Sequence, residues 1–201
     1  MIKRFDTKSD PVLSNIIDSI EDSLKCLKFL EHSNIIEIDT WENIKFKMPH
    51  HKEIAQKGFG FCIPNYLEYG VKRIVIINMQ NCNRVNFTER EIAAIIYHEL
   101  GHLLNAPELF PVPTVGYCFI NEIKYNKNLE EEIRTGNPIK MEVFADSYAN
   151  LYGYGDELIS TFHKQNQFFD QKIEYFDTRV EKIKSKELFE GNVMPIETNP
   201  W

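Results

Sequence analysis

A stretch near the middle of the chain repeats hydrophobic residues at three- and four-residue spacing, which predicts a helix with one apolar face. Thr88 and Glu91 precede the stripe with the spacing of a capping box, in which the two side chains satisfy free N–H groups of a first helical turn. Asn105 and Pro107 are stop signals. We therefore expect a helix over roughly 89–104. Its apolar positions are Ile92, Ile95, Ile96, Leu100, Leu103 and Leu104.

Further stretches show the same helical spacing. One covers residues 11–31, where Pro11 suits the first turn, and a second covers roughly 139–152. A third helix is expected at about 156–168, followed by charged helical sequence to about 187. The apolar stripe of the helix expected at 139–152 consists of Met141, Phe144, Ala145, Tyr148, Ala149 and Tyr152.

The first half of the chain also contains short runs typical of β-strands. Residues 71–78 are rich in β-branched side chains and are the clearest of these runs. Residues 34–39, 44–48 and 58–63 are predicted as three further strands. Together with the helices they indicate an α+β fold, in which a small mixed or antiparallel sheet packs on the helix at 89–104.

With 201 residues the chain is long enough for one domain with a sizeable core. We expect a single domain over 1–201: residues 1–87 form a helix and the sheet, 88–155 hold two helices and a crossover, and 156–201 form a helical C-terminal part with a tail. The crossover at 105–137 exceeds an ordinary loop. It is interpreted either as a lid or specificity loop or as a simple surface excursion.

Composition and charge narrow the expected partners. A hydrophobic content of 43% and a charged content of 26% are those of an ordinary globular protein. The net charge of −7 disfavours nucleic acid and anionic membranes as main partners. No signal-peptide core and no apolar run of membrane-spanning length is present, which favours a cytoplasmic location. The cysteines contain no C-x-x-C pair, which favours reduced thiols and disfavours a cysteine zinc site; they are Cys26, Cys62, Cys82 and Cys118.

The sequence His98-Glu99-Leu100-Gly101-His102 adds chemistry to the predicted helix. Positions i and i+4 share one helix face, so both imidazoles can reach one metal ion, and Glu99 can approach a water on that metal. The same pattern also arises by chance, as a surface histidine next to a glutamate. Gly101 costs the helix about 1 kcal/mol relative to alanine, which indicates that something packs close to its backbone.

A third metal ligand is predicted on the helix at 139–152. A catalytic zinc takes three protein ligands and leaves its fourth position to water. Glu142 and Asp146 lie four residues apart on one side of that helix, and burying two carboxylates there without a partner is costly. We expect Glu142 to bind zinc and Asp146 to accept the free ring N–H of His98. Two alternatives stay open: Asp146 is the ligand, or both acids face solvent.

These residues resemble a known family. The H-E-x-x-H motif followed by E-x-x-x-D from Glu142 to Asp146 is similar to the gluzincin metallopeptidases, where the Glu is the third zinc ligand and the Asp supports the first His. The E-x-x-A-D-x-x-A run starting at Glu142 also resembles small intracellular or membrane-linked zinc peptidases and compact proteins of bacteriophages and their hosts. The resemblance covers residues 88–105 and 140–158. It implies a zincin-like fold and one Zn²⁺ ion.

The function expected from this pattern is that of a zinc-dependent metallopeptidase. Zinc lowers the pKa of a bound water to about 7, and Glu99 takes the proton and later returns it to the leaving amine. In zincins of this layout an antiparallel edge strand above the metal pairs with an extended peptide. A hydrogen-bond donor that stabilises the oxyanion is also expected. Each candidate can alternatively be an ordinary packed aromatic residue or a surface histidine. The candidates are Tyr152, Tyr154 and His163.

Two other functions remain compatible with the sequence. The chain can be a non-catalytic or structural zinc protein that retains the zincin fold, for example a virion component inside a larger protein assembly. It can also hydrolyse a non-peptide amide or ester, which the same three ligands permit. The expected partner is a peptide or protein substrate, with no nucleic acid and no membrane. A phage-encoded protein would be found in the virion or the host cytoplasm.

Overall fold

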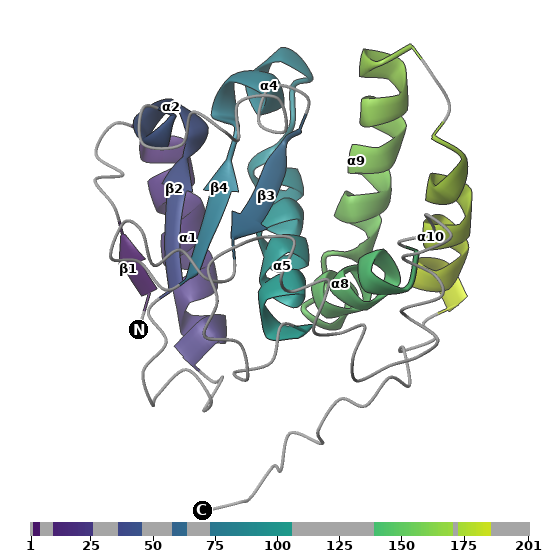
Figure 1. The fold of residues 1–201 in the computed structure, drawn as a ribbon, viewed down its shortest axis with the longest axis horizontal. Helices are drawn as coiled ribbons and strands as arrows, with labels where there is room; N and C mark the ends of the chain where they lie inside the picture. The colour runs from purple at the N-terminus through teal and green to yellow at the C-terminus, as the bar shows by residue number, and fades with distance from the viewer. Residues whose placement is uncertain are drawn as a thin grey trace, which may run out of the picture.

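The computed structural model describes residues 2–4, 10–25, 36–45, 58–63, 73–105, 139–170 and 173–185. Within these ranges the chain forms one mixed sheet and two groups of helices (Figure 1). The strands are β1 (Ile2–Arg4), β2 (Ile36–Thr40), β3 (Gly60–Ile63) and β4 (Arg73–Ile77). The helices are α1 (Pro11–Lys25), α2 (Trp41–Ile44), α4 (Met79–Arg84), α5 (Glu89–Asn105), α8 (Ile139–Leu151), α9 (Gly155–Phe168) and α10 (Glu174–Ser185).

The sheet has the strand order β1-β2-β4-β3. β1, β2 and β4 are parallel, with Ile38 opposite Val75 in the β2–β4 pair. β3 runs antiparallel to β4, with Cys62 also opposite Val75, and forms one edge of the sheet as far as the described residues show. The predicted α+β class with a small mixed sheet is therefore confirmed.

One face of the sheet packs against α1 and α5. The β-branched residues of β4 that point to this face, Val75 and Ile77, are fully buried in the core. Figure 1 shows α1 and α5 running behind the strands, and α5 contacts both β3 and β4. The apolar stripes predicted for these helices supply the other side of the core. Its helical members include Leu13, Ile16, Ile17, Ile20, Ile92, Ile95, Ile96 and Leu100.

α8 packs along the other side of α5, and α9 and α10 cover α8 (Figure 1). Gly101 allows α5 and α8 to approach closely. A Cβ atom at this position would lie 2.7 Å from the Cα atom of Ala145 and 3.1 Å from the Cβ atom of Tyr148, nearer than real Cβ atoms come to backbone. The close packing inferred from a glycine inside a helix is therefore confirmed, and its partner is the backbone of α8.

The first two residues of the strand predicted at 44–48 do not lie in a strand. Residues 44–48 alternate apolar and basic side chains, but Ile44 ends helix α2 and Lys45 is its C-cap. The helix begins here because Thr40 accepts a hydrogen bond from the Asn43 N–H at 3.3 Å, and Asp39 accepts one from the Thr40 N–H at 2.7 Å. This N-terminal capping outweighs the alternating pattern that follows it.

Some predictions lie outside the described residues. These are the last turns expected for the first helix, at 26–31, residues 46–48, the crossover beyond Asn105, and the C-terminal tail after Ser185. Among the described residues, no helix has both the length and the apolar character needed to cross a bilayer.

Candidate metal centre

Hydrogen bonds fix the first turn of α5, the helix that carries the histidines. The Thr88 N–H donates to Glu91 at 2.7 Å, and the Glu91 N–H donates to the Thr88 hydroxyl at 3.2 Å, which is the predicted capping box. Lys164 and Ser160 of α9 donate to the same carboxylate at 2.7 and 2.6 Å. Burial raises the pKa of Glu91, but these hydrogen bonds outweigh burial and lower it. α5 is thereby held against α9 at its N-terminal end.

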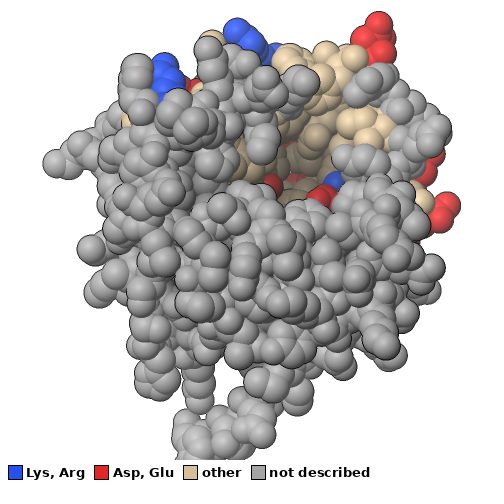
Figure 2. All heavy atoms as spheres, in the orientation of Figure 1, with Lys and Arg blue, Asp and Glu red and all other residues tan. Residues whose placement is uncertain are grey.

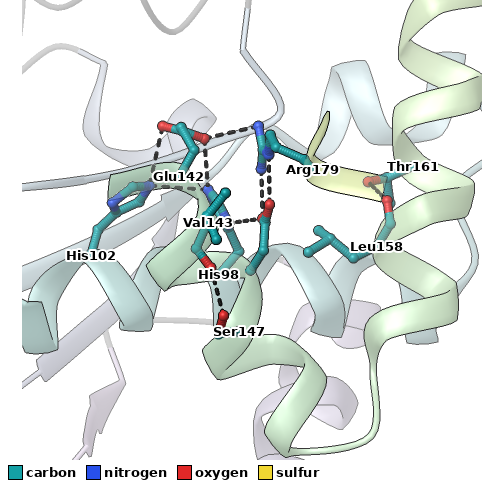
Figure 3. A network of polar contacts seen from close by, with 9 residues as sticks. His98, His102, Glu142, Val143, Ser147, Leu158, Thr161 and Arg179 are labelled. Atoms are coloured by element: carbon teal, nitrogen blue, oxygen red, sulfur yellow. Dashed lines mark hydrogen bonds and ion pairs between the residues drawn. The ribbon is translucent and has the colours of Figure 1, made fainter. Parts of the chain in front are cut away.

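The three predicted metal ligands lie together (Figure 3). The Nε2 atoms of His98 and His102 are 3.0 Å apart. One carboxylate oxygen of Glu142 lies 3.5 Å from His98 Nε2, and the other lies 3.5 Å from His102 Nε2. Within the described residues this is the one group of His, Cys, Asp or Glu side chains whose ligand atoms, all within 4.8 Å of one another, could hold an ion.

The spacing of these atoms fits a tetrahedral zinc ion. Bonds of about 2.0–2.1 Å to nitrogen and oxygen at a tetrahedral angle separate neighbouring ligand atoms by about 3.3 Å. The two Nε2 atoms lie 3.0 Å apart and each lies 3.5 Å from a different oxygen of Glu142, so neighbouring donor atoms of the cluster have separations of this order. Two imidazoles and one carboxylate are also a donor set that zinc accepts, with a fourth position left for water or substrate.

Asp146 lies behind His98. Its carboxylate is 1% exposed and lies 2.8 Å from His98 Nδ1. An ionised carboxylate only accepts hydrogen bonds, so His98 Nδ1 carries a proton, and the Nε2 atom of His98 lies on the side of His102 and Glu142. The structure therefore brings Asp146 to the supporting position expected from the sequence and places Glu142, rather than Asp146, beside both imidazoles.

Arg179 of α10 joins this network and was not predicted from the sequence. Its Nε and Nη2 atoms bind the two oxygens of Asp146 at 2.6 and 2.7 Å, and Nη1 lies 2.9 Å from Glu142 (Figure 3). A sequence signal for it exists. Phe176 and Ile183 of α10 are buried, and Arg179 stands between them at helical spacing, which places a charge on an apolar stripe.

The electrostatics of the cluster keep its carboxylates ionised. Burial raises the pKa of Glu142, but His102, His98 and Arg179 outweigh burial and hold it well below its usual range. Burial also raises the pKa of Asp146, and the guanidinium of Arg179 is the main cause of its net lowering. For His102, burial lowers the pKa while Glu142 and Glu99 raise it, with a net increase. Glu142 therefore carries a negative charge beside the two imidazoles.

Glu99 lies where α5 meets the edge strand β3. A Cβ atom at Gly60 would lie 3.4 Å from Glu99 Cγ and 2.6 Å from the Ile95 side chain, so this glycine lets the strand cross close over the helix. Glu99 is 8% exposed. Figure 2 shows a hollow on the face of the molecule seen in Figure 1, with acidic and basic atoms visible at its floor.

The three candidates for an oxyanion donor lie elsewhere. Tyr152 and Tyr154 stack on Tyr97, with ring centroids 4.7 and 4.9 Å apart. Tyr152 follows Glu142 by ten residues, which corresponds to about 15 Å along a helix. His163 is exposed on α9. None of the three has a described contact with His98, His102 or Glu142. The two tyrosines pack against Tyr97, and His163 is exposed on the surface.

No protein-family model, curated protein or solved structure matches this chain. The class of protein has to be inferred from the arrangement of the site itself.

Proposed function

We propose that this chain is a zinc-dependent metallopeptidase of the gluzincin type, in which His98, His102 and Glu142 hold one Zn²⁺ ion. The observation that supports it most is the convergence of His98, His102 and Glu142 from α5 and α8, with ligand atoms all within 4.8 Å of one another and Asp146 beside His98 Nδ1. A zinc ion bound there supplies Lewis acidity, which lowers the pKa of water and polarises a carbonyl group.

Glu99 is the proposed general base. It follows His98 directly in the chain and lies beside β3, so it stands between the metal ligands and the edge of the sheet. In the proposed reaction its carboxylate takes a proton from the attacking water and gives it to the leaving amine when the peptide bond breaks. Its charge also acts on His102, whose pKa it helps to raise.

The substrate we propose is an extended peptide or protein segment. β3 is antiparallel to β4 and stands at the sheet edge in the described part of the chain. An edge strand offers main-chain N–H and C=O groups to another extended chain. Since Gly60 of β3 lies against Glu99, a peptide paired with this strand would pass beside the base.

The decisive experiment compares zinc content and hydrolysis in the wild type and in Glu99→Gln. Zinc is measured by elemental analysis and by anomalous scattering at the zinc edge, and hydrolysis with unfolded casein and a peptide library. Glu99→Gln should bind zinc as the wild type does but hydrolyse peptides about 1000-fold more slowly, because the base is lost. Glu89→Gln, an exposed change in the same helix, is the matched control.

Two results would count against the proposal. If Glu99→Gln keeps wild-type turnover, the assignment of the base is wrong. If the wild type binds zinc but cleaves neither casein nor any library peptide, the chain is a non-catalytic zinc protein.

A further inference from the structure

Arg179 is a buried cation shared by two carboxylates of different roles. It is 4% exposed and reaches the metal centre from α10, the C-terminal helix among the described elements. Two of its nitrogens bind Asp146, the acceptor of the His98 proton, and the third lies 2.9 Å from Glu142, the proposed ligand. One guanidinium plane thus contacts both groups that set the orientation of the metal site.

Aromatic rings hold the guanidinium in place. Its central carbon lies 4.3 Å from the ring centroid of Phe162 and 5.5 Å from that of Phe176. Those two rings stack on each other at 4.5 Å, which joins α9 to α10 behind the metal centre. The plane of the guanidinium is therefore set by packing, and the directions of its N–H groups follow from that plane.

We propose that Arg179 is a positioning residue of the metal centre, which fixes the rotamers of Glu142 and Asp146 and makes metal binding depend on the docking of α10. This inference rests on the proposed zinc site. Asp146 would keep its 2.8 Å contact with His98 only while both of its oxygens are held. Glu142 would turn toward the two imidazoles because Arg179 limits its rotation.

The proposed positioning role depends on the shape of the Arg179 side chain as well as on its charge. An uncharged residue in place of Arg179 would have two opposite effects on Zn²⁺ affinity. The carboxylates would attract Zn²⁺ more strongly because their charge is no longer neutralised, but they would also lose the hydrogen-bond donors that hold them. Arg179→Lys keeps the charge, but an ammonium group is a point donor that cannot bind both oxygens of Asp146 and one of Glu142 in a single plane. Comparison with lysine therefore isolates positioning.

The test measures metal affinity rather than activity. Zn²⁺ affinity is determined by chelator competition, and the visible spectrum of the Co²⁺-loaded protein reports the coordination geometry. Arg179→Lys should lower Zn²⁺ affinity about 10- to 100-fold, as loss of partners behind metal ligands does, and should change the Co²⁺ bands. Arg84→Lys, at an exposed position in the last turn of α4, should change neither.

Phe162→Leu provides a second variant if the lysine protein fails to fold. It keeps Arg179 but removes the ring that sets its plane, so affinity should fall in the same direction by a smaller factor, about threefold. Wild-type affinity and spectrum in either folded variant would show that Arg179 is not a positioning residue, while the zinc site itself would stand. A wild type that binds no Zn²⁺ would overturn both the site and its positioning.

Discussion

The interface between α5 and α8 contains two unlike regions. At one end His98 and His102 of α5 meet Glu142 and Asp146 of α8 in a network of charged and hydrogen-bonding groups. At the other end four tyrosines pack ring against ring, from both helices and the turn that follows α8. They are Tyr97, Tyr148, Tyr152 and Tyr154.

The difference shows that one helix pair serves two physical purposes. In the tyrosine region the rings stack, and burial raises the pKa of Tyr148, so this end stays uncharged. In the metal region Glu142 and Asp146 both contact the guanidinium of Arg179. One end of the interface is therefore a packed aromatic cluster, and the other is a charged cluster that could hold a metal ion.

The largest expected effect is that of His98→Ala on the metal region. Loss of one of three ligands should reduce Zn²⁺ affinity roughly 1000-fold or more, because ligand bonds supply most of the binding free energy. Far-UV circular dichroism should stay unchanged, since the core of sheet and helices remains. Chelator competition measures the affinity, and His163→Ala on the exposed side of α9 is the control. Unchanged Zn²⁺ affinity in His98→Ala would show that this region does not bind the metal.

Gly101→Ala should affect both regions at once. The added methyl group would lie 2.7 Å from the backbone of Ala145 and 3.1 Å from Tyr148, so the helices must separate. We expect a net loss of about 2 kcal/mol in the free energy of unfolding, after the gain of about 1 kcal/mol from helix propensity. Zn²⁺ affinity should fall as well. Urea unfolding measures the first effect, with Asn15→Ala in an exposed turn of α1 as control.

Tyr97→Leu should affect the tyrosine region alone. Stacking with Tyr152 and Tyr154 is lost while an apolar side chain remains, so the free energy of unfolding should fall by about 1.5 kcal/mol. Zn²⁺ affinity should stay within a factor of two or so of the wild type, because stacking supplies no ligand. A tenfold drop in affinity would mean that the two regions are not independent.

The smallest effect is expected from Glu91→Gln, which tests a buried carboxylate outside both regions. It weakens the bonds to Thr88 and Lys164, at a cost of about 1 kcal/mol near neutral pH. The folded pKa of Glu91 is below its unfolded value, so its contribution is complete above about pH 4.3 and is lost as the pH falls through the folded pKa. The stability difference between the two proteins should therefore vanish in acid. Glu89→Gln, exposed in the same turn, is the control.

The sequence predicts the parts of this site that depend on local spacing. The i and i+4 histidines share a face of any helix, and the capping box with its apolar stripe establishes that helix. Glu142 and Asp146 follow from the same rule on α8. Ile44 differs from its prediction as a strand residue, because it belongs to the helix that Thr40 caps.

Long-range partners could not be predicted in the same way. Arg179 lies 33 residues beyond Asp146, and only the packing of α10 on α8 brings them together. The same holds for the surroundings of Tyr152, which follows the ligand helix closely in sequence and whose ring stacks on Tyr97. The sequence places a residue on a helix face, while tertiary packing decides which neighbour that face meets.

The distribution of the network along the chain has a consequence for biosynthesis. Asp146 follows His98 by 48 residues and precedes Arg179 by 33. At about 5–20 residues per second, several seconds of translation separate the paired imidazoles from the guanidinium that completes their surroundings. During this interval the nascent chain exposes two histidines without their partners. The complete surroundings of a bound zinc ion would therefore exist only after α10 has left the ribosome.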